Sequence, residues 1–492
     1  MECLQHGEGC FSTAVRGRAG PVRRTRFASP IVSTFEVLPV SKIVGSTDGL
    51  TTAQTDFTKI LIFAGILALV LAISIFSPYL GIVALTLLFC GLVVGCNLTW
   101  SVLVLAFLLP IDPQVEVKQG FFVYFDLFFI LPVVVYFWKV VFAKLRVNWW
   151  SLALGPYVLF AVASCLGRAE NFYWFAGYSA RLMIAVLFMT VVACVMRAET
   201  VTLVLAAGLI PQVIYGLYQL TVGDLGTLYM WIYPHFKDQI WSNRARALFF
   251  TDNNLGGYCA IVLVMLLALA QRSRSIGSRF LCYSMAGISL IGLASSGSRG
   301  AWLAFIAGIA VLLVCNRRHL SMKFAVTAVV VIAILAASAA ALMQYEPLER
   351  SVTLDDYTVE GRSTAYIAAG LLFLQHPLIG VGLTNYQEMM SSVVNWDLSA
   401  SAAHNTYLQI LSENGLIGFV LFFGPVLYIL IRNLKAAKQS TAALIVSAAL
   451  TVFLVHGLFD FQLMTAPQYL LLFAILIGLG SQTLAPTGWS HS

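Results

Sequence analysis

The sequence predicts an all-α polytopic membrane protein. Sixty per cent of its residues are hydrophobic and only 10% are charged, whereas a soluble domain carries about 25% charged residues. Apolar runs close to the roughly 20 residues that a helix needs to cross a bilayer recur along the chain. Such runs are typical of helices, because the strands of a membrane barrel are shorter and alternate in polarity. The composition therefore excludes a soluble enzyme fold.

The apolar runs divide the chain into a tail, a membrane domain and a short end. Residues 1–57 are basic and lack the hydrophobic core of a signal peptide, which predicts a flexible tail. A targeting segment for an organelle, or a start codon placed too early, are the alternatives. Residues 58–484 form the predicted transmembrane domain with its loops, and residues 485–492 form a short C-terminal tail.

Each apolar run is assigned to one spanning segment. The expected segments are 58–77, 79–95, 97–111, 121–143, 150–166, 178–196, 198–220, 254–271, 280–296, 300–315, 324–344, 416–431, 441–458 and 466–483. The second and third are short enough to form one re-entrant hairpin, which sets the expected number of helices at 12 to 14.

The basic residues predict the orientation of these segments. With the N-terminus inside, short basic connections such as "QRSRSIGSR" and "NRRHLSMK" all fall on the cytosolic face. The net charge of +7 is scattered among these connections, which fits membrane orientation and not nucleic-acid binding. Two long loops, 221–253 and 345–415, then lie outside. The nine cysteines show no metal-ligand spacing, and no metal or cofactor is predicted.

Several arginines lie on the outer side, against the general trend of the basic residues. They are Arg181, Arg244, Arg246, Arg299 and Arg362. One interpretation pairs them with acids such as Asp252 and Glu360. The favoured interpretation is an anion site, because the guanidinium fork matches phosphate oxygens. A lipid-linked pyrophosphate, with its tail in the bilayer, matches both the charge and the depth.

The stretch "AHNTYLQILSENGLIG" at 403–418 is unusually polar for this chain. We expect a short surface helix over 404–414, capped by Ser401 or a neighbour and ended by Asn414-Gly415. Glu413 falls on the face opposite His404, so it is expected to pair with Gln409 or an arginine and to serve structure before catalysis.

Four sequence blocks carry a resemblance to a known family. They are "RARALFFTDNNLGGYCAIVL", "LASSGSRGAWLA", "EGRSTAYIAAGLLFLQHPLIGVGLTNYQ" and "HNTYLQILSENGLIG". In this order they resemble the O-antigen ligase and polymerase superfamily of bacterial membrane glycosyltransferases, over roughly residues 200–432. In Asp252-Asn253-Asn254 the chain departs from the Asn-Pro-Asn that the family often has.

The resemblance implies a GT-C-like, metal-independent enzyme of the bacterial inner membrane. Such enzymes move a glycan from undecaprenyl pyrophosphate to an acceptor hydroxyl, with inversion, on the periplasmic side. The pyrophosphate arginines of the family correspond to Arg246 and Arg299, and less closely to Arg244, Arg362 and Arg181. The catalytic histidine corresponds to His404, with Asn405 and Glu413 in support. A base that accepts the proton of the acceptor is what this chemistry requires; a capping or hydrogen-bonding histidine is the alternative.

Other functions stay open at this point. The acceptor is lipid A-core, a growing glycan or a protein side chain, and membrane lipids are the remaining partners. A transporter of bicarbonate or another small anion, and a flippase or scaffold, are rival classes. A transporter typically has polar groups inside paired broken helices, whereas the spans here are nearly free of charge, which favours the enzyme. Asp460 and Gln462 are interpreted as too shallow to change this.

Overall fold

The computed structural model describes the larger part of the chain from Leu98 onward. The described ranges are 98–110, 114–118, 121–124, 129–143, 147–224, 226, 244–315, 356–394, 402–461, 463 and 467–485. All of them belong to one compact unit within Val70–Ser492. The predicted tail at 1–57 and the predicted spans at 58–77, 79–95 and 324–344 lie outside the described residues.

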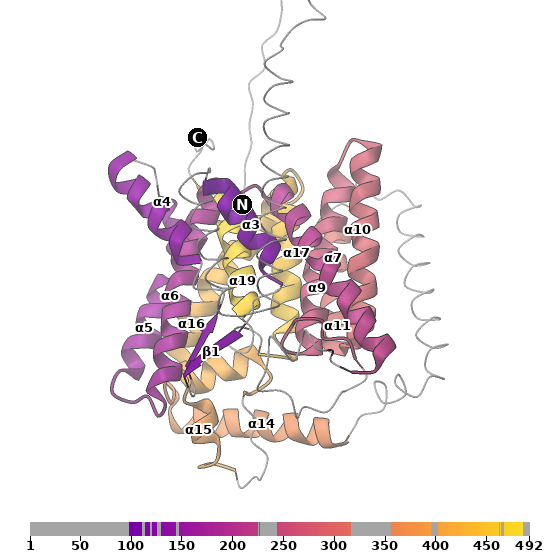
Figure 1. Cartoon of the computed structure of the whole chain (residues 1–492). Helices are drawn as coiled ribbons and strands as arrows, with labels where there is room; N and C mark the ends of the chain where they lie inside the picture. The colour runs from indigo at the N-terminus through magenta and orange to yellow at the C-terminus, as the bar shows by residue number, and fades with distance from the viewer. Residues whose placement is uncertain are drawn as a thin grey trace, which may run out of the picture. The chain divides into compact units, whose positions relative to one another are not determined.

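Helices dominate the described residues (Figure 1). The α-helices are α3 (Leu98–Leu108), α4 (Ile130–Ala143), α5 (Gly155–Cys165), α6 (Phe172–Val195), α7 (Ala198–Val222), α9 (Asp252–Arg272), α10 (Ile276–Ser296), α11 (Arg299–Cys315), α14 (Asp356–Gln375), α15 (Tyr386–Met390), α16 (Thr406–Ala436), α17 (Thr441–His456) and α19 (Pro467–Ser481). Two short 3₁₀ helices, η3 (Trp149–Leu152) and η5 (Gln482–Leu484), complete the helical elements. Among the described helices, five are long and apolar enough to cross a membrane, namely α6, α7, α9, α10 and α16. The chain is an all-α polytopic membrane protein.

Most predicted spans in the described ranges coincide with a helix to within a few residues. The prediction for 121–143 is wrong at its start. Phe121–Tyr124 is strand β2, which pairs antiparallel with β1 (Gln114–Lys118), and the helix begins only at Ile130. The sequence of β1, "QVEVK", lies just before this apolar run and alternates in polarity as strands do. It was the available signal that a β-hairpin, and not a helix, occupies the start of the run.

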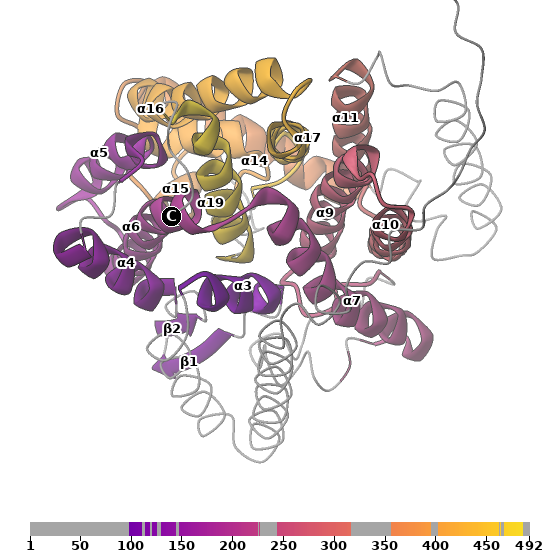
Figure 2. The same ribbon diagram turned by 90° about the horizontal axis from the view of Figure 1, so that it is seen from above.

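The helices differ in how much of their surface is buried by other helices. Helix α9 is 89% buried over its most apolar window, whereas α10 is only 28% buried. Helix α19 lies between α6 and α17 in the view from above (Figure 2) and contacts both. A helix that is hydrophobic all round belongs in the interior, so α9 and α19 form the centre and α10 faces outward.

Helix α16 is broken at Gly415, as predicted from Asn414-Gly415. Its backbone there has φ 60° and ψ −167°, which is not helical. The amide groups of Leu416 and Ile417, just past the break, donate to the carbonyls of Pro377 and Leu378, at 2.8 and 3.1 Å. The break is therefore paired by a neighbouring segment, as the interior of a membrane protein requires.

Replacing Gly415 with alanine should destabilise the protein strongly. A Cβ atom there would clash with the Leu378 carbonyl group, and the left-handed φ adds strain. We expect a loss of more than about 3 kcal/mol in the free energy of unfolding, measured as a fall of the melting temperature in detergent.

Gly370→Ala is the matched control, because Gly370 lies inside α14 and nothing stands within 4 Å of the position that an added Cβ atom would take. Alanine there should leave the melting temperature unchanged or raise it slightly. Equal melting temperatures for the two variants would contradict the interpretation of the break.

Candidate functional site

His404 lies directly before α16, and its neighbour caps that helix. The Asn405 side chain accepts hydrogen bonds from the amides of Tyr407 and Leu408, at 2.9 and 3.1 Å. The prediction of a helix that starts near His404 is confirmed, with Asn405 itself as the cap. Ser401, which was named as a candidate cap, lies outside the described residues.

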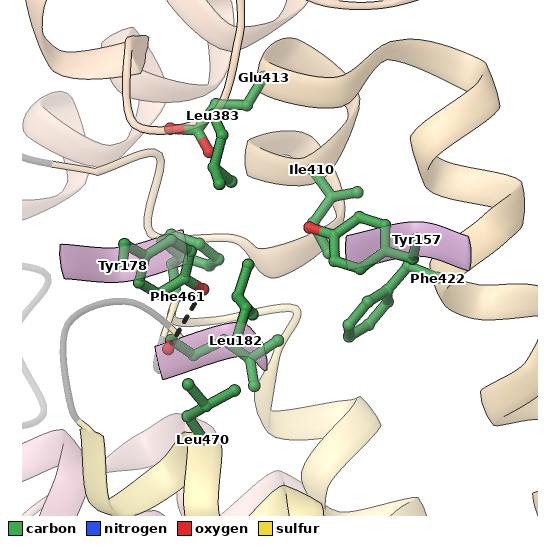
Figure 3. A pocket seen from close by; sticks show the side chains of 10 residues that line it. Tyr157, Tyr178, Leu182, Leu383, Ile410, Glu413, Phe422, Phe461 and Leu470 are labelled. Carbon is green, nitrogen blue, oxygen red and sulfur yellow. Dashed lines mark hydrogen bonds between the residues drawn. The ribbon is translucent and has the colours of Figure 1, made fainter. Parts of the chain in front are cut away.

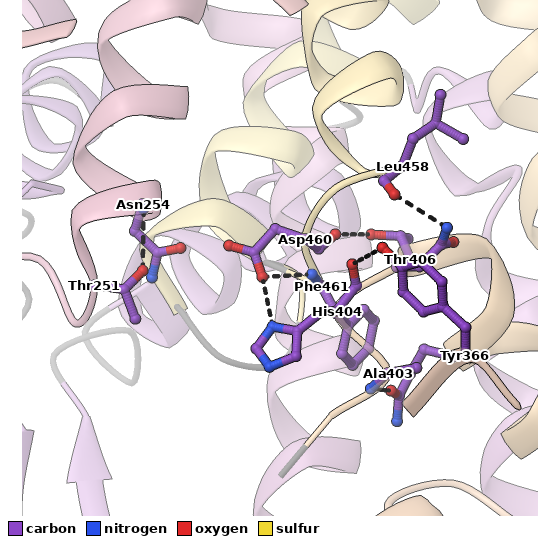
Figure 4. Close-up of polar contacts among 11 residues, drawn as sticks. Thr251, Asn254, Tyr366, Ala403, His404, Thr406, Leu458, Asp460 and Phe461 are labelled. Atoms are coloured by element: carbon purple, nitrogen blue, oxygen red, sulfur yellow. Dashed lines mark hydrogen bonds and ion pairs between the residues drawn. The ribbon is translucent and has the colours of Figure 1, made fainter. Parts of the chain in front are cut away.

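The start of α16 is tied to the end of α17 (Figure 4). The Thr406 amide donates to the Gly457 carbonyl at 2.7 Å. The Thr406 hydroxyl donates to the Asp460 carbonyl at 3.0 Å, and the Asn405 side-chain amide donates to the Leu458 carbonyl at 3.1 Å. These bonds place His404 beside Asp460, although the two are far apart in the sequence.

The imidazole of His404 faces the Asp460 carboxylate. His404 Nδ1 and Asp460 Oδ1 are 3.5 Å apart, long for a hydrogen bond but close enough for a charged contact. The His404 side chain is 39% exposed, whereas the Asp460 side chain is only 8% exposed. His404 also has a left-handed backbone, with φ 46°. Non-glycine residues in that conformation concentrate at functional sites.

Basic groups surround the buried Asp460 carboxylate. Burial by itself raises the pKa of Asp460, but the hydrogen bond and charge of His404 and the charges of His456 and Arg362 lower it below its usual value. The Phe461 amide also donates to this carboxylate, at 2.8 Å. Asp460 is therefore ionised at neutral pH, and it can hold a partner imidazole in one orientation.

The sequence interpretation missed the role of Asp460. It placed this residue at the outer end of a late helix and judged it too shallow to matter. A carboxylate that follows a histidine within "HGLFDF", directly after an apolar helix, was the available signal. Its partner could not be read from the sequence, because 56 residues separate His404 from Asp460 in the numbering.

A second cluster forms where Arg244 and Arg246 pass the end of α7. Buried Gln219 of α7 accepts from the amides of Arg246 and Ala247, at 3.1 and 2.8 Å, and returns a bond to the Ala247 carbonyl at 3.1 Å. Buried Gln212 accepts from the Leu248 amide at 3.1 Å. The two glutamines lie seven residues apart, on one face of α7. Together with the bond from the Ala245 amide to the Ser295 carbonyl of α10, at 3.0 Å, they fix an irregular segment of the chain.

Arg244 passes over the turn between α10 and α11, a turn that is close in sequence to Arg299. The Arg244 guanidinium lies 3.1 Å from the Asp252 carboxylate, which confirms the pairing with Asp252 for this one arginine. Its side chain passes over Gly297, two residues before Arg299 opens α11. Asp252-Asn253-Asn254, where the chain departs from the family's pattern, forms the first turn of α9. Thr251 caps this helix.

The two clusters adjoin each other. Gly300, in the first turn of α11, packs against Phe459, the residue before Asp460. The backbone of the Arg244–Arg246 segment and the start of α11 at Arg299 thus lie near the turn that carries Asp460. Among the remaining predicted arginines, Arg362 influences Asp460 directly, and Arg181 lies apart in α6 near Tyr178.

Glu413 points away from this site, into the protein. Its carboxylate accepts from the Gln409 side chain at 2.8 Å and from the backbone amides of Thr384 and Tyr386. The predicted pairing with Gln409 is confirmed. The predicted surface position of this helix is wrong, because Glu413 is only 2% exposed and the residues around it are also buried.

Glu413 also borders a small internal cavity (Figure 3). Its other lining residues are Tyr157, Tyr178, Leu182, Leu383, Ile410, Phe422, Phe461, Leu463 and Leu470. The lining is mostly apolar, and the Tyr178 hydroxyl donates to the Leu463 carbonyl at 3.4 Å. A carboxylate so enclosed serves the packing of α16 against its neighbours.

Comparison with known proteins bears on this arrangement. Residues 284–423 match the family model described as O-antigen ligase. Over this segment the chain is similar to the O-antigen ligase family. The matched residues of the O-antigen ligase segment include Arg299, Arg362, His404 and Glu413, and they end before Asp460. No curated protein matches the chain. Within the described ranges, no three His, Cys, Asp or Glu residues lie close enough to hold a metal ion.

Replacing Gln409 with leucine should destabilise the protein by about 2–4 kcal/mol, because the buried Glu413 carboxylate and the buried Ala403 amide would each lose a hydrogen-bond partner. Gln409 accepts from the Ala403 amide at 2.7 Å and donates to Glu413. The measurement is the melting temperature in detergent, with Ser391→Ala, at an exposed site, as the control. A melting temperature equal to that of the control would disprove the proposed anchor.

Proposed function

We propose that this protein acts as an O-antigen ligase-type glycosyltransferase, which moves a glycan from undecaprenyl pyrophosphate to an acceptor hydroxyl at the periplasmic side of the inner membrane. The observation that carries the proposal is the exposed His404 imidazole backed by the buried Asp460 carboxylate, beside a cluster of arginines. The family match supports the class of reaction. A ligase that uses lipid A-core and a polymerase that uses a growing glycan share this chemistry.

His404 is proposed as the base. With Nδ1 directed to Asp460, the imidazole carries its proton on that nitrogen and presents Nε2 to the acceptor. Nε2 takes the hydroxyl proton while the acceptor oxygen bonds to the anomeric carbon of the donor sugar. The bond from that carbon to the pyrophosphate oxygen breaks, and its electron pair leaves with the pyrophosphate. Attack opposite to the leaving group inverts the configuration of the sugar.

The arginines are proposed to hold the departing pyrophosphate. Arg299 stands at the first position of α11, where the helix dipole also favours an anion. The Arg246 amide donates to Gln219 of α7, which fixes the backbone from which the Arg246 side chain extends. Arg362 and Arg181 are proposed as further, less central contacts. Stabilising the charge that develops on the leaving group is the main contribution expected of such donors.

The His404–Asp460 pair gives the first functional prediction. His404→Ala should reduce glycan transfer by roughly 10²- to 10⁴-fold, the usual contribution of a positioned base, and His404→Gln should be nearly as inactive. Donor binding should persist in both. Asp460→Asn should lower kcat less than these variants, because the Asp460 carboxylate orients His404 and does not itself accept the proton.

The assay uses purified protein with lipid-linked donor and acceptor, and addition of a chelator should leave the rate unchanged. Asn433→Ala, in the far half of α16, is the control for general damage to this helix. Transfer at near wild-type rate by His404→Ala would show that the base lies elsewhere, and would reopen the transporter alternative.

The arginine cluster gives the second functional prediction. Arg299→Ala and Arg246→Ala should weaken binding of the lipid-linked donor and slow transfer, while lysine should restore only part of either, because a point charge cannot form the fork. Arg274→Ala removes the same charge from an exposed site between α9 and α10 and should change neither property. If Arg299→Ala folds and binds the donor normally, the pyrophosphate site is misplaced.

A further inference from the structure

Helix α14 exposes an apolar stripe on one face. Ile367, Leu371 and Leu374 are 57%, 38% and 72% exposed, and their spacing of four and three residues places them in one row along the helix. The opposite face, with Ala368 and Leu372, is fully buried in a small core of its own. The exposed row is thus not the face that holds α14 to the rest of the protein.

The stripe continues past the end of the helix. Leu378 and Ile379 are 61% and 42% exposed. The hydrogen bonds that pair the break of α16 place them alongside Leu416 and Ile417, which are 50% and 41% exposed. Val420, one turn further on, is 58% exposed. The apolar surface is therefore continuous from α14 onto the outer face of α16.

The likeness of this surface to the lipid-facing side of α16, with which it is continuous, indicates what covers it. Helix α16 is one of the helices that are long and apolar enough to cross a membrane, so its exposed leucine, isoleucine and valine face lipid. Helix α14 lies across the ends of α9, α11 and α17 and roughly perpendicular to them (Figure 1). A helix in that position, whose exposed apolar row continues the lipid-facing surface of α16, is placed to meet the boundary between headgroups and acyl chains.

We propose that Ile367, Leu371, Leu374, Leu378 and Ile379 form a membrane-contact surface that seats α14 in one leaflet of the bilayer. The occupant is the lipid itself, at the depth where acyl chains meet headgroups. Helix α14 also carries Arg362 and Tyr366. The membrane contact of α14 would therefore fix the depth of these residues, and of His404 beside them, relative to the bilayer surface. Arg362 and Leu374 are twelve residues apart, about 18 Å along a helix. The lipid contact holds whether or not the proposed transfer reaction is correct.

The test places a fluorescent reporter on this surface in the full chain. The native cysteines are replaced, a single cysteine is introduced as Leu374→Cys, and an environment-sensitive dye is attached. The protein is then reconstituted in nanodiscs of phosphatidylethanolamine and phosphatidylglycerol. Val420→Cys reports the lipid-facing span, and Ser391→Cys, exposed at the end of α15, reports water.

The dye at 374 should lose most of its emission when nitroxide-labelled acyl chains are present, as at 420, and should resist iodide in the water. The dye at 391 should behave in the opposite way. Ile367→Cys is a second reporter on the same row, in case Leu374→Cys lowers the melting temperature. Quenching of the dye at 374 or 367 by iodide as at 391 would overturn the proposal. Protection from both quenchers would also overturn it, because a second copy or another protein would then cover the surface.

Discussion

Backbone pairing at both ends of the segment 404–417 holds the candidate site together. At one end, Thr406 and Asn405 bond to the carbonyls after α17. At the other end, the amides of Val381 and Gly382 donate to the carbonyls of Ser412 and Glu413, at 2.9 and 2.8 Å. Unpaired backbone groups are costly in a protein surrounded by lipid. This cost fixes the start and the break of α16, and hence the position of His404.

The strain in this segment is local and is supported by its neighbours. His404 and Thr384 have left-handed backbones, with φ of 46° and 67°. Each lies where a side chain or backbone bond from another element holds the turn: Tyr366 donates to the His404 carbonyl at 3.5 Å, and Glu413 accepts from the Thr384 amide. A strained turn of this kind is rigid once it is paired, which suits a side chain that must meet a reacting hydroxyl in one geometry.

The carboxylates of the two clusters, Asp460 and Asp252, differ in how deeply they are buried. Asp460 is buried and ionised, so it attracts the basic groups around it and orients His404. Asp252 pairs with Arg244 near the surface, with side chains 15% and 26% exposed, where water weakens the attraction. An anionic ligand can therefore compete for Arg244 more easily than for a guanidinium in a fully buried pair. Under the proposed function, this difference would hold the base firmly and let the anion contacts adapt to the ligand.

The sequence by itself determined the fold class, most helix boundaries, the break at Gly415 and the similarity to the O-antigen ligase family. Each of these depends on residues close together in the chain: an apolar run, an Asn-Gly pair or a short motif. The tertiary structure alone decided that Asp460 meets His404, that glutamines of α7 hold the arginine segment, and that the start of α16 is buried. Those contacts join helices far apart in the sequence, and their geometry comes from how backbone groups pair when the helices pack.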